Sequence, residues 1–392
     1  MDPAPLFPSF LIGGFECSTH RLASGLRLDM VAATGHDRHV AADYARLLGR
    51  GIRTAREGIR WHLIEPAPGR LDFASVRPTL RAARQAGIQV IWDLLHYGWP
   101  DDLDIWGPEF VERFARLARG FAEVLASEGS GAPWIVPVNE ISFLSWKGGE
   151  IGEMNPFTLS RGFELKAQLV RASIAAIRAV REVLPGARFA QVEPIFHVIA
   201  DPSRPEEAPA AESYRLAQYQ AWDMLTGRLC PELGGRAEYL DALGVNYYPW
   251  NQWIFEGSTA EGTTIGFDHP GRRPLSAMLR ENQDRYRRPL FVAETGTEGD
   301  DRPGWLGHVG DEVHAAILGG VDIVGLCLYP IVNFPGWDNG RDCQNGLWGQ
   351  ADETGVRPIH LPLALEMERQ RRRLDGPSPS DRGGSMRTLE AT

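Results

Sequence analysis

Eight short apolar, strand-like runs alternate with longer amphipathic segments between residues 10 and 374. The runs cover residues 10–17, 54–61, 89–96, 134–140, 188–196, 242–248, 290–296 and 323–330. The segments with helical periodicity cover residues 39–51, 73–87, 109–129, 163–184, 213–227, 274–287, 305–320 and 361–374. Parallel strands are joined by crossover helices, and eight strand–helix units close a sheet on itself. The sequence therefore predicts a single-domain (β/α)8 barrel over residues 1–374.

An open, doubly wound sheet is the alternative arrangement of such units. That fold commonly carries a GxGxxG turn between its first strand and the next helix. The first run contains only "LIGGF" (11–15), with no helix start after it, which favours the barrel. Residues 375–392 are rich in proline, serine and glycine, and we predict a disordered C-terminal tail there.

Several classes of function do not fit the composition. The formal net charge is -10 and no basic block occurs, so nucleic acid is not an expected partner. No apolar run is long enough for a membrane span, and we see no signal peptide, so we expect a cytoplasmic protein. The four cysteines form no CxxC pair, and HxH and HExxH are absent, so we expect no metal and no cofactor. The oligomeric state stays open.

The ends of the strand-like runs carry polar and aromatic side chains. In (β/α)8 barrels the reacting groups lie at the carboxyl ends of the strands and in the loops that follow. Amides, imidazoles and carboxylates suit the hydroxyl rim of a sugar, and tryptophan suits its apolar face. The candidates are His20, Arg56, His96, Asn139, Glu140, Asn246, Tyr247, Tyr248, Glu294, Tyr329, Trp337 and Asp338.

Two of these candidates are carboxylates at the ends of the fourth and seventh runs, Glu140 and Glu294. These strands are expected to lie across the barrel from each other, so the two side chains can face one another over its mouth. Two carboxyl groups about 5–5.5 Å apart cleave a glycoside with retention, and a gap of about 6.5–9.5 Å gives inversion. We therefore expect a small-molecule carbohydrate or glycoside as substrate.

Six segments, in chain order between about residues 9 and 350, resemble motifs of glycoside hydrolase family 1, the β-glucosidase family. "WIVPVNEISF" (134–143) resembles its "TxNEP" segment, and "LFVAETGTE" (290–298) its "ITENG" segment. "DALGVNYYPW" (241–250) and "LLHYGWPDDL" (94–103) resemble its "DFLGINYY" and "LxHWDLPxxL" segments. The other two are "FLIGGFECSTHRL" (10–22) and "GIRTAREGIRWHLIEP" (51–66).

The resemblance implies a retaining double displacement, with Glu140 as acid/base and Glu294 as nucleophile. It further implies that Asn139 holds the sugar 2-hydroxyl, and that Arg56 with Tyr247 or Tyr248 positions the nucleophile. A cation beside Glu294 would favour its charged form. Glu140 must start protonated and so should lie in a drier site or feel the charge of Glu294.

The chain departs from the family pattern at several positions. Ile141 follows Asn139–Glu140 in place of proline, and His20 stands where a glutamine is expected. Pro335–Gly336 replaces the glutamate that grips the 4- and 6-hydroxyls, with Asp338 nearby. Tyr329 stands in place of a tryptophan. We therefore expect the chemistry to be kept and sugar recognition to differ from that of a cellobiose-type enzyme.

Alternatives remain for both residues and function. Glu193 in "VEP" is a rival acid on the fifth run, whereas Glu57 should point to the opposite face of its strand from Arg56. A barrel that binds carbohydrate without hydrolysing it, a transglycosylase and a metal-dependent barrel hydrolase are the alternatives to a β-glycosidase.

Overall fold

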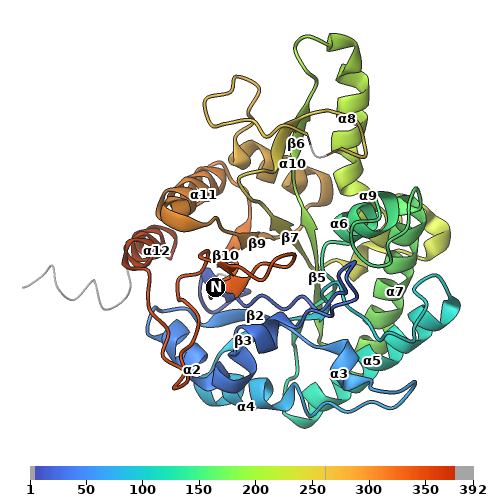
Figure 1. Cartoon of the computed structure of the whole chain (residues 1–392), viewed down its shortest axis with the longest axis vertical. Helices are drawn as coiled ribbons and strands as arrows, with labels where there is room; N and C mark the ends of the chain where they lie inside the picture. The colour runs from blue at the N-terminus through green and yellow to red at the C-terminus, as the bar shows by residue number, and fades with distance from the viewer. Residues whose placement is uncertain (1–4, 261, 376–392) are drawn as a thin grey trace, which may run out of the picture.

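The computed structural model describes residues 5–260 and 262–375. Eight parallel strands close into a barrel, with helices between them and around them (Figure 1). In order around the barrel the strands are β1 (Leu11–Gly14), β10 (Ile323–Leu328), β9 (Leu290–Thr295), β7 (Ala242–Asn246), β5 (Arg188–Pro194), β4 (Trp134–Val138), β3 (Gln89–Leu95) and β2 (Thr54–Gly58). The predicted (β/α)8 barrel is confirmed. The tail predicted for 375–392 lies, apart from Asp375, outside the described residues.

The longer helices cover the outside of the barrel. They are α2 (His36–Leu48), α4 (Arg77–Ala86), α5 (Pro108–Ser127), α7 (Gly162–Val183), α10 (Leu275–Tyr286), α11 (Arg302–Leu318) and α12 (Leu361–Leu374). The shorter helices are α1 (Met30–Ala33), α3 (Trp61–Ile64), α6 (Ile141–Leu144), α8 (Ala208–Leu216) and α9 (Gln220–Leu225). Within the described ranges, no helix is both long and apolar enough to cross a membrane.

Two small sheets lie outside the barrel. β6 (His197–Ile199) pairs in parallel with β8 (Gln252–Ile254), and this pair projects from the barrel together with α8 (Figure 1). β11 (Phe334–Pro335) pairs with β12 (Asp342–Cys343) in a hairpin after β10. Trp337 and Asp338, two predicted site residues, lie in the turn of this hairpin.

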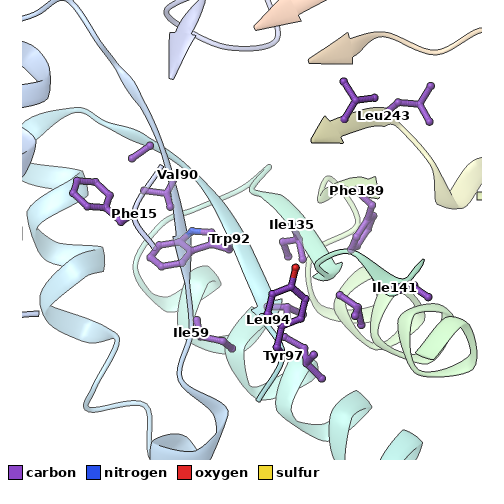
Figure 2. Close-up of a cluster of buried hydrophobic side chains, with 14 of the residues drawn as sticks. Phe15, Ile59, Val90, Trp92, Leu94, Tyr97, Ile135, Ile141, Phe189 and Leu243 are labelled. Atoms are coloured by element: carbon purple, nitrogen blue, oxygen red, sulfur yellow. The ribbon is translucent and has the colours of Figure 1, made fainter. Parts of the chain in front are cut away.

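The core has two layers because alternate residues of each strand face opposite sides. One layer fills the barrel, and Phe7 closes its lower end against Trp134 and Phe291, with ring centroids 5.4 and 5.3 Å away. The other layer lies between strands and helices, and Figure 2 shows part of it, including Trp92 and Phe189. Gly14 is required at its position, because an added Cβ would lie 2.2 Å from Cδ2 of Tyr329 inside the barrel.

Several predicted elements differ from the structure in their bounds, and two of these differences have a clear local cause. The first run was expected to continue to residue 17, but β1 ends at Gly14, and the Glu16 carboxylate turns back to accept from the backbone N–H of Ser18 at 3.0 Å. The helix expected over 213–227 is divided into α8 and α9 by a 3-10 turn. Gln218 in this turn bonds the backbone N and O of Phe196 at 3.0 and 3.1 Å, so a tertiary contact overrides the helical pattern.

Candidate active site

The carboxyl ends of the barrel strands bring together most of the predicted site residues in one hydrogen-bonded cluster. Asn139 and Glu140 directly follow β4, and Glu294 lies near the end of β9; these two strands are separated around the barrel by β5 and β7. Parallel strands end at the same edge of a sheet, so these side chains share the mouth of the barrel. The cluster also contains Arg56, His96, Asn246, Tyr248 and Tyr329.

Arg56 lies at the centre of this cluster and is fully buried. Its Nη1 donates to Oε1 of Glu294 at 2.7 Å, and its Nε and Nη2 donate to the two oxygens of Asp93 at 3.1 and 2.6 Å. Nη2 also donates to Oδ1 of Asn139 at 2.6 Å. The planar fork of arginine suits such multiple contacts to carboxylates. Arg56 therefore fixes a carboxylate and an amide that come from opposite sides of the site.

Glu294 is the penultimate residue of β9, and both of its carboxylate oxygens are bonded. Oε1 accepts from Arg56, and Oε2 accepts from the hydroxyl of Tyr248 at 2.9 Å. Tyr248 in turn stacks on the exposed ring of Trp250, with ring centroids 5.1 Å apart. The guanidinium and the phenol therefore hold this buried carboxylate in a defined orientation.

The orientation of the Asn139 amide follows from Arg56. Because Oδ1 accepts from Arg56, Nδ2 is the donor side, and it lies 3.0 Å from the hydroxyl of Tyr97 and 3.2 Å from Nε2 of His96. His96 Nε2 must then be an acceptor, so its proton is on Nδ1, which lies 3.0 Å from Oδ2 of Asp93. This bond geometry fits the neutral tautomer with its proton on Nδ1, although, against the effect of burial, Cys17 and Asp93 together raise the pKa of His96 well above its usual value.

Glu140 has a different environment from that of Glu294. It follows β4 with a left-handed φ of 45°, and its Oε1 accepts from Nδ2 of Asn246 at 2.8 Å. Its Oε2 accepts from the hydroxyl of Tyr97. Burial, with the negative charge of Glu294 adding to it, raises the pKa of Glu140 to about 8, although both hydrogen bonds oppose the rise. Near neutral pH the site therefore offers a protonated Glu140 carboxyl group beside Glu294, which is paired with Arg56.

His20 and Trp337 approach the same region from the loops after β1 and β10. Their ring centroids are 4.7 Å apart, and Trp337 also packs against Tyr97 at 5.9 Å. Burial lowers the pKa of His20 to about 3, so its ring is neutral. Within the described part of the chain, buried atoms without a hydrogen-bond partner include His20 Nδ1, Trp337 Nε1 and Asn246 Oδ1. A bound ligand with hydroxyl groups can satisfy such atoms.

Tyr329 and Asp338 lie at different depths. The Tyr329 ring lies inside the barrel, with the Arg56 guanidinium 5.3 Å from its centroid and the His96 ring parallel to it at 6.1 Å. Asp338 is exposed in the hairpin turn. The structure therefore places Tyr329 beneath the cluster and Asp338 on the rim.

The hydrogen bonds bear on two alternatives that the sequence leaves open, namely which tyrosine contacts Glu294 and what Glu193 contacts. Tyr247 is directed away from Glu294, because its hydroxyl accepts from Gln252 at 2.8 Å and its ring stacks on Trp305; Tyr248 is the tyrosine that contacts Glu294. Glu193 accepts from the backbone N–H groups of Ile141 and Ser142 at 3.0 and 2.9 Å, so it holds the first turn of α6 behind Glu140.

Glu57 points to the opposite face of β2 from Arg56, as predicted. It lies on the helix side of β2, where it accepts from Tyr44 at 2.8 Å and contacts His36 at 2.9 Å. The neighbouring Arg56 points into the barrel, as alternation along a strand requires.

Three residues of the cluster were missed from the sequence: Cys17, Asp93 and Tyr97. Asp93 had a signal, because a carboxylate inside the apolar run "QVIWDLLH" must have a partner when it is buried. No sequence signal marks Tyr97 as a site residue, because its position depends on a left-handed φ of 67° just after β3. Cys17 lies 3.2 Å from Nδ1 of His96 and 3.7 Å from the hydroxyl of Tyr329.

Cys17, Asp93 and His96 place possible metal-ligand atoms within 4.8 Å of one another. Their existing bonds do not suit an ion. Both oxygens of Asp93 accept from Arg56, and a metal on His96 Nδ1 would put the imidazole proton on Nε2, facing the donor Nδ2 of Asn139. Burial also raises the pKa of the Cys17 thiol, whereas a ligand must be a thiolate.

Solved structures show what this fold resembles. The family 1 β-glucosidase from Thermotoga maritima superposes with a TM-score of 0.75 at 16% identity, over 93% of this chain and 98% of that one. The same enzyme in complex with glucoimidazole gives a TM-score of 0.74 at 16% identity, with 93% and 97% covered. Its complex with deoxynojirimycin gives 0.75 at 16% identity, with 94% and 98% covered.

The sequence comparisons add no assignment, since no family model and no curated protein sequence matches the chain. The chain therefore has the fold of the family 1 β-glucosidases, a (β/α)8 barrel covered almost from end to end by the superposition. At this identity the likeness concerns the fold alone.

Proposed function

We propose that the chain is a retaining β-glycosidase that hydrolyses a β-linked glycoside by double displacement. The barrel of residues 1–374 forms its single catalytic domain. One observation carries the proposal: two buried glutamates at one barrel mouth have opposite electrostatic environments. Glu294 is paired with Arg56 at 2.7 Å, while burial and the Glu294 charge raise the pKa of Glu140 to about 8. Such separated environments assign base and acid roles to two carboxyl groups.

In the first step the carboxylate of Glu294 attacks the anomeric carbon of the sugar. The bond from that carbon to the aglycone oxygen breaks, and Glu140 transfers its proton to this oxygen. Arg56 and Tyr248 hold Glu294 in position before the attack. The products of this step are the free aglycone and a glycosyl ester on Glu294.

In the second step a water molecule attacks the same carbon and Glu294 leaves as a carboxylate. Glu140, now ionised, accepts the proton of that water. Because esterification has removed the negative charge of Glu294, the pKa of Glu140 falls and its charged form is easier to reach. The same residue thus acts as acid and then as base.

Recognition of the sugar is proposed to differ from that of a glucose-specific site. Pro335–Gly336 offers no carboxylate where the resemblance leads one to expect a sugar-gripping glutamate. Two buried atoms without a partner are available instead. His20 Nδ1 can donate or accept a hydrogen bond, and Trp337 Nε1 can donate one. We propose that these two side chains bind hydroxyls of the sugar, with Asn139 and His96 deeper in the site and Asp338 at the rim.

Trapping with a 2-deoxy-2-fluoro aryl β-glycoside tests this function. The fluorine slows both steps, and a good leaving group lets the glycosyl-enzyme accumulate. Aryl β-glucoside, galactoside, fucoside, xyloside and mannoside substrates should first be screened for turnover, and the matching fluorosugar then used. A covalent adduct on the peptide containing Glu294 supports the proposal. Binding of the sugars without turnover or an adduct identifies a carbohydrate-binding barrel instead.

A further inference from the structure

Tyr97 makes direct contact with the proposed acid/base although no sequence pattern marks it. Its hydroxyl donates to Oε2 of Glu140 and accepts from Nδ2 of Asn139 at 3.0 Å. The side chain is 2% exposed and belongs to the buried cluster of Figure 2. Its ring packs against Phe143 and Trp337 at 5.6 and 5.9 Å, so the hydroxyl has little freedom to leave Glu140.

Both partners of this contact have unusual backbone conformations. Tyr97 has a φ of 67° and Glu140 a φ of 45°, and neither is a glycine. Non-glycine residues in the left-handed region are strained and persist where the surrounding structure holds them, commonly at functional sites. Two such residues from consecutive strand ends therefore meet through one hydrogen bond.

The direction of that hydrogen bond follows from its neighbours. Arg56 fixes the Asn139 amide so that Nδ2 faces Tyr97, and the Tyr97 oxygen is an acceptor toward it. The phenolic proton is then directed to Oε2 of Glu140, which accepts it. The acidic proton of Glu140 accordingly belongs on Oε1. Oε1 also accepts from Nδ2 of Asn246 at 2.8 Å, which is compatible with a proton on Oε1 because a carboxyl O–H oxygen can donate and accept at once.

We propose that Tyr97 is a positioning residue for Glu140: its hydroxyl fixes Oε2, leaves Oε1 to carry the transferable proton, and stabilises the carboxylate formed when that proton departs. This inference rests on the proposed function. Burial and the Glu140 charge raise the pKa of Tyr97 well above its usual value, so the phenol stays a donor. The donated bond opposes the rise of the Glu140 pKa that burial and Glu294 cause.

Other charged or titratable groups also face this pair and are unchanged by a substitution of Tyr97. They come from the loop after β1, β2, the loop after β3, β5, the loop after β7, and β9, and they are Glu16, His20, Arg56, His96, Glu193, Tyr248 and Glu294. A pH effect specific to the Tyr97 hydroxyl is therefore measured against a constant background.

Tyr97→Phe keeps the ring and removes only the hydroxyl. We expect the alkaline limb of the kcat/KM profile, which reports the acid, to move up by roughly one to two pH units, because the carboxylate loses a charge-assisted hydrogen bond. The acidic limb should stay in place, because the removed hydroxyl bonds Glu140 and Asn139 and makes no hydrogen bond to Glu294. Tyr44→Phe is the matched control, since Tyr44 donates to Glu57 at 2.8 Å outside the barrel, and it should move neither limb.

Replacement of Tyr97 by 3-fluorotyrosine gives the opposite test, because the more acidic phenol donates more strongly and should move the alkaline limb down. An alkaline limb unchanged in both variants of a hydrolysing protein overturns the role of Tyr97 and leaves the proposed function intact. If the wild type hydrolyses no glycoside, the proposed function fails. A carbon-13 titration of the Glu140 carboxyl then still reports the contact, and a pKa unchanged by Tyr97→Phe overturns the inference separately.

Discussion

Arg56 Nη1 lies 2.7 Å from Oε1 of Glu294, although 238 positions separate the two residues in the chain. The same guanidinium also holds Asp93 and Asn139. One buried cation therefore orients the proposed nucleophile and, through Asn139, the hydroxyl of Tyr97 that contacts the proposed acid. Arg56 thus orients both the proposed nucleophile Glu294 and, through Asn139 and Tyr97, the proposed acid Glu140.

Replacing Arg56 by methionine should impair both stability and catalysis. Asp93 and Glu294 would remain buried without a cation, which costs about 3–5 kcal/mol in the free energy of unfolding. The folded fraction should also lose at least about 100-fold in kcat, since Glu294 is no longer oriented. Urea unfolding and kcat of the folded protein measure the two effects.

Arg113→Met is the control for Arg56. Arg113 is also buried, and it bonds the buried Glu65 at 3.0 Å and the partly exposed Asp102 at 2.7 Å, outside the barrel interior. The Arg113→Met substitution should lower the free energy of unfolding but leave the kcat of the folded protein close to that of the wild type. Full kcat in Arg56→Met would remove Arg56 from the catalytic site.

Glu140→Ala should separate substrates by their leaving groups. A phenolate such as dinitrophenolate departs without a proton, whereas an alkoxide needs one, so first-step rates should fall far more for alkyl than for dinitrophenyl glycosides. Single-turnover measurements give these rates. Glu193→Gln, which loosens α6 behind Glu140, should slow both substrates by a similar factor. Equal losses in Glu140→Ala would exclude the acid role.

The pH dependence of stability should also report Glu140. Its pKa is raised from 4.5 to about 8 on folding, so the folded state keeps a proton that the unfolded state loses across this window. Stability should therefore fall as the pH rises from 4.5 to 8, with a slope of at most about 1.4 kcal/mol per pH unit for this proton. Glu193, whose burial raises its pKa to about 7, adds a slope of the same sign.

Glu140→Gln removes one of these two titrations. Urea unfolding between about pH 5 and 8 should show a smaller loss of stability in the variant than in the wild type. Identical slopes for the two proteins would contradict the raised pKa of Glu140.

Trp337→Phe tests the role of the hairpin turn in binding. The ring contacts with His20 and Tyr97 are kept, but the unpartnered Nε1–H is removed. We expect KM to rise by roughly 2- to 10-fold with little change in kcat, as for the loss of one hydrogen bond to the substrate. Trp61→Phe, which loses the buried bond from Nε1 to Glu65, should leave KM unchanged. Unchanged KM in Trp337→Phe would place Trp337 outside the sugar site.

Much of the fold follows from short-range patterns in the sequence. Apolar runs and helical periodicity locate all eight strands, and the two-residue alternation places Arg56 inside and Glu57 outside the barrel. The charge environments of Glu140 and Glu294 do not follow from such patterns, because they depend on burial and on partners from other strands. Tyr97 depends on one left-handed backbone angle, and the direction of Tyr247 depends on Gln252 and Trp305.

Chemical rescue of Glu294→Ala tests the central claim most directly. With an activated aryl β-glycoside, the variant should lose hydrolysis, and added azide should restore release of the phenol. Azide occupies the space of the missing carboxylate and attacks the anomeric carbon as the phenolate departs, so the product should be the α-glycosyl azide. Proton NMR of the anomeric hydrogen identifies that product. Wild-type hydrolysis rates in Glu294→Ala, or rescue that gives the β-glycosyl azide, would contradict Glu294 as the nucleophile.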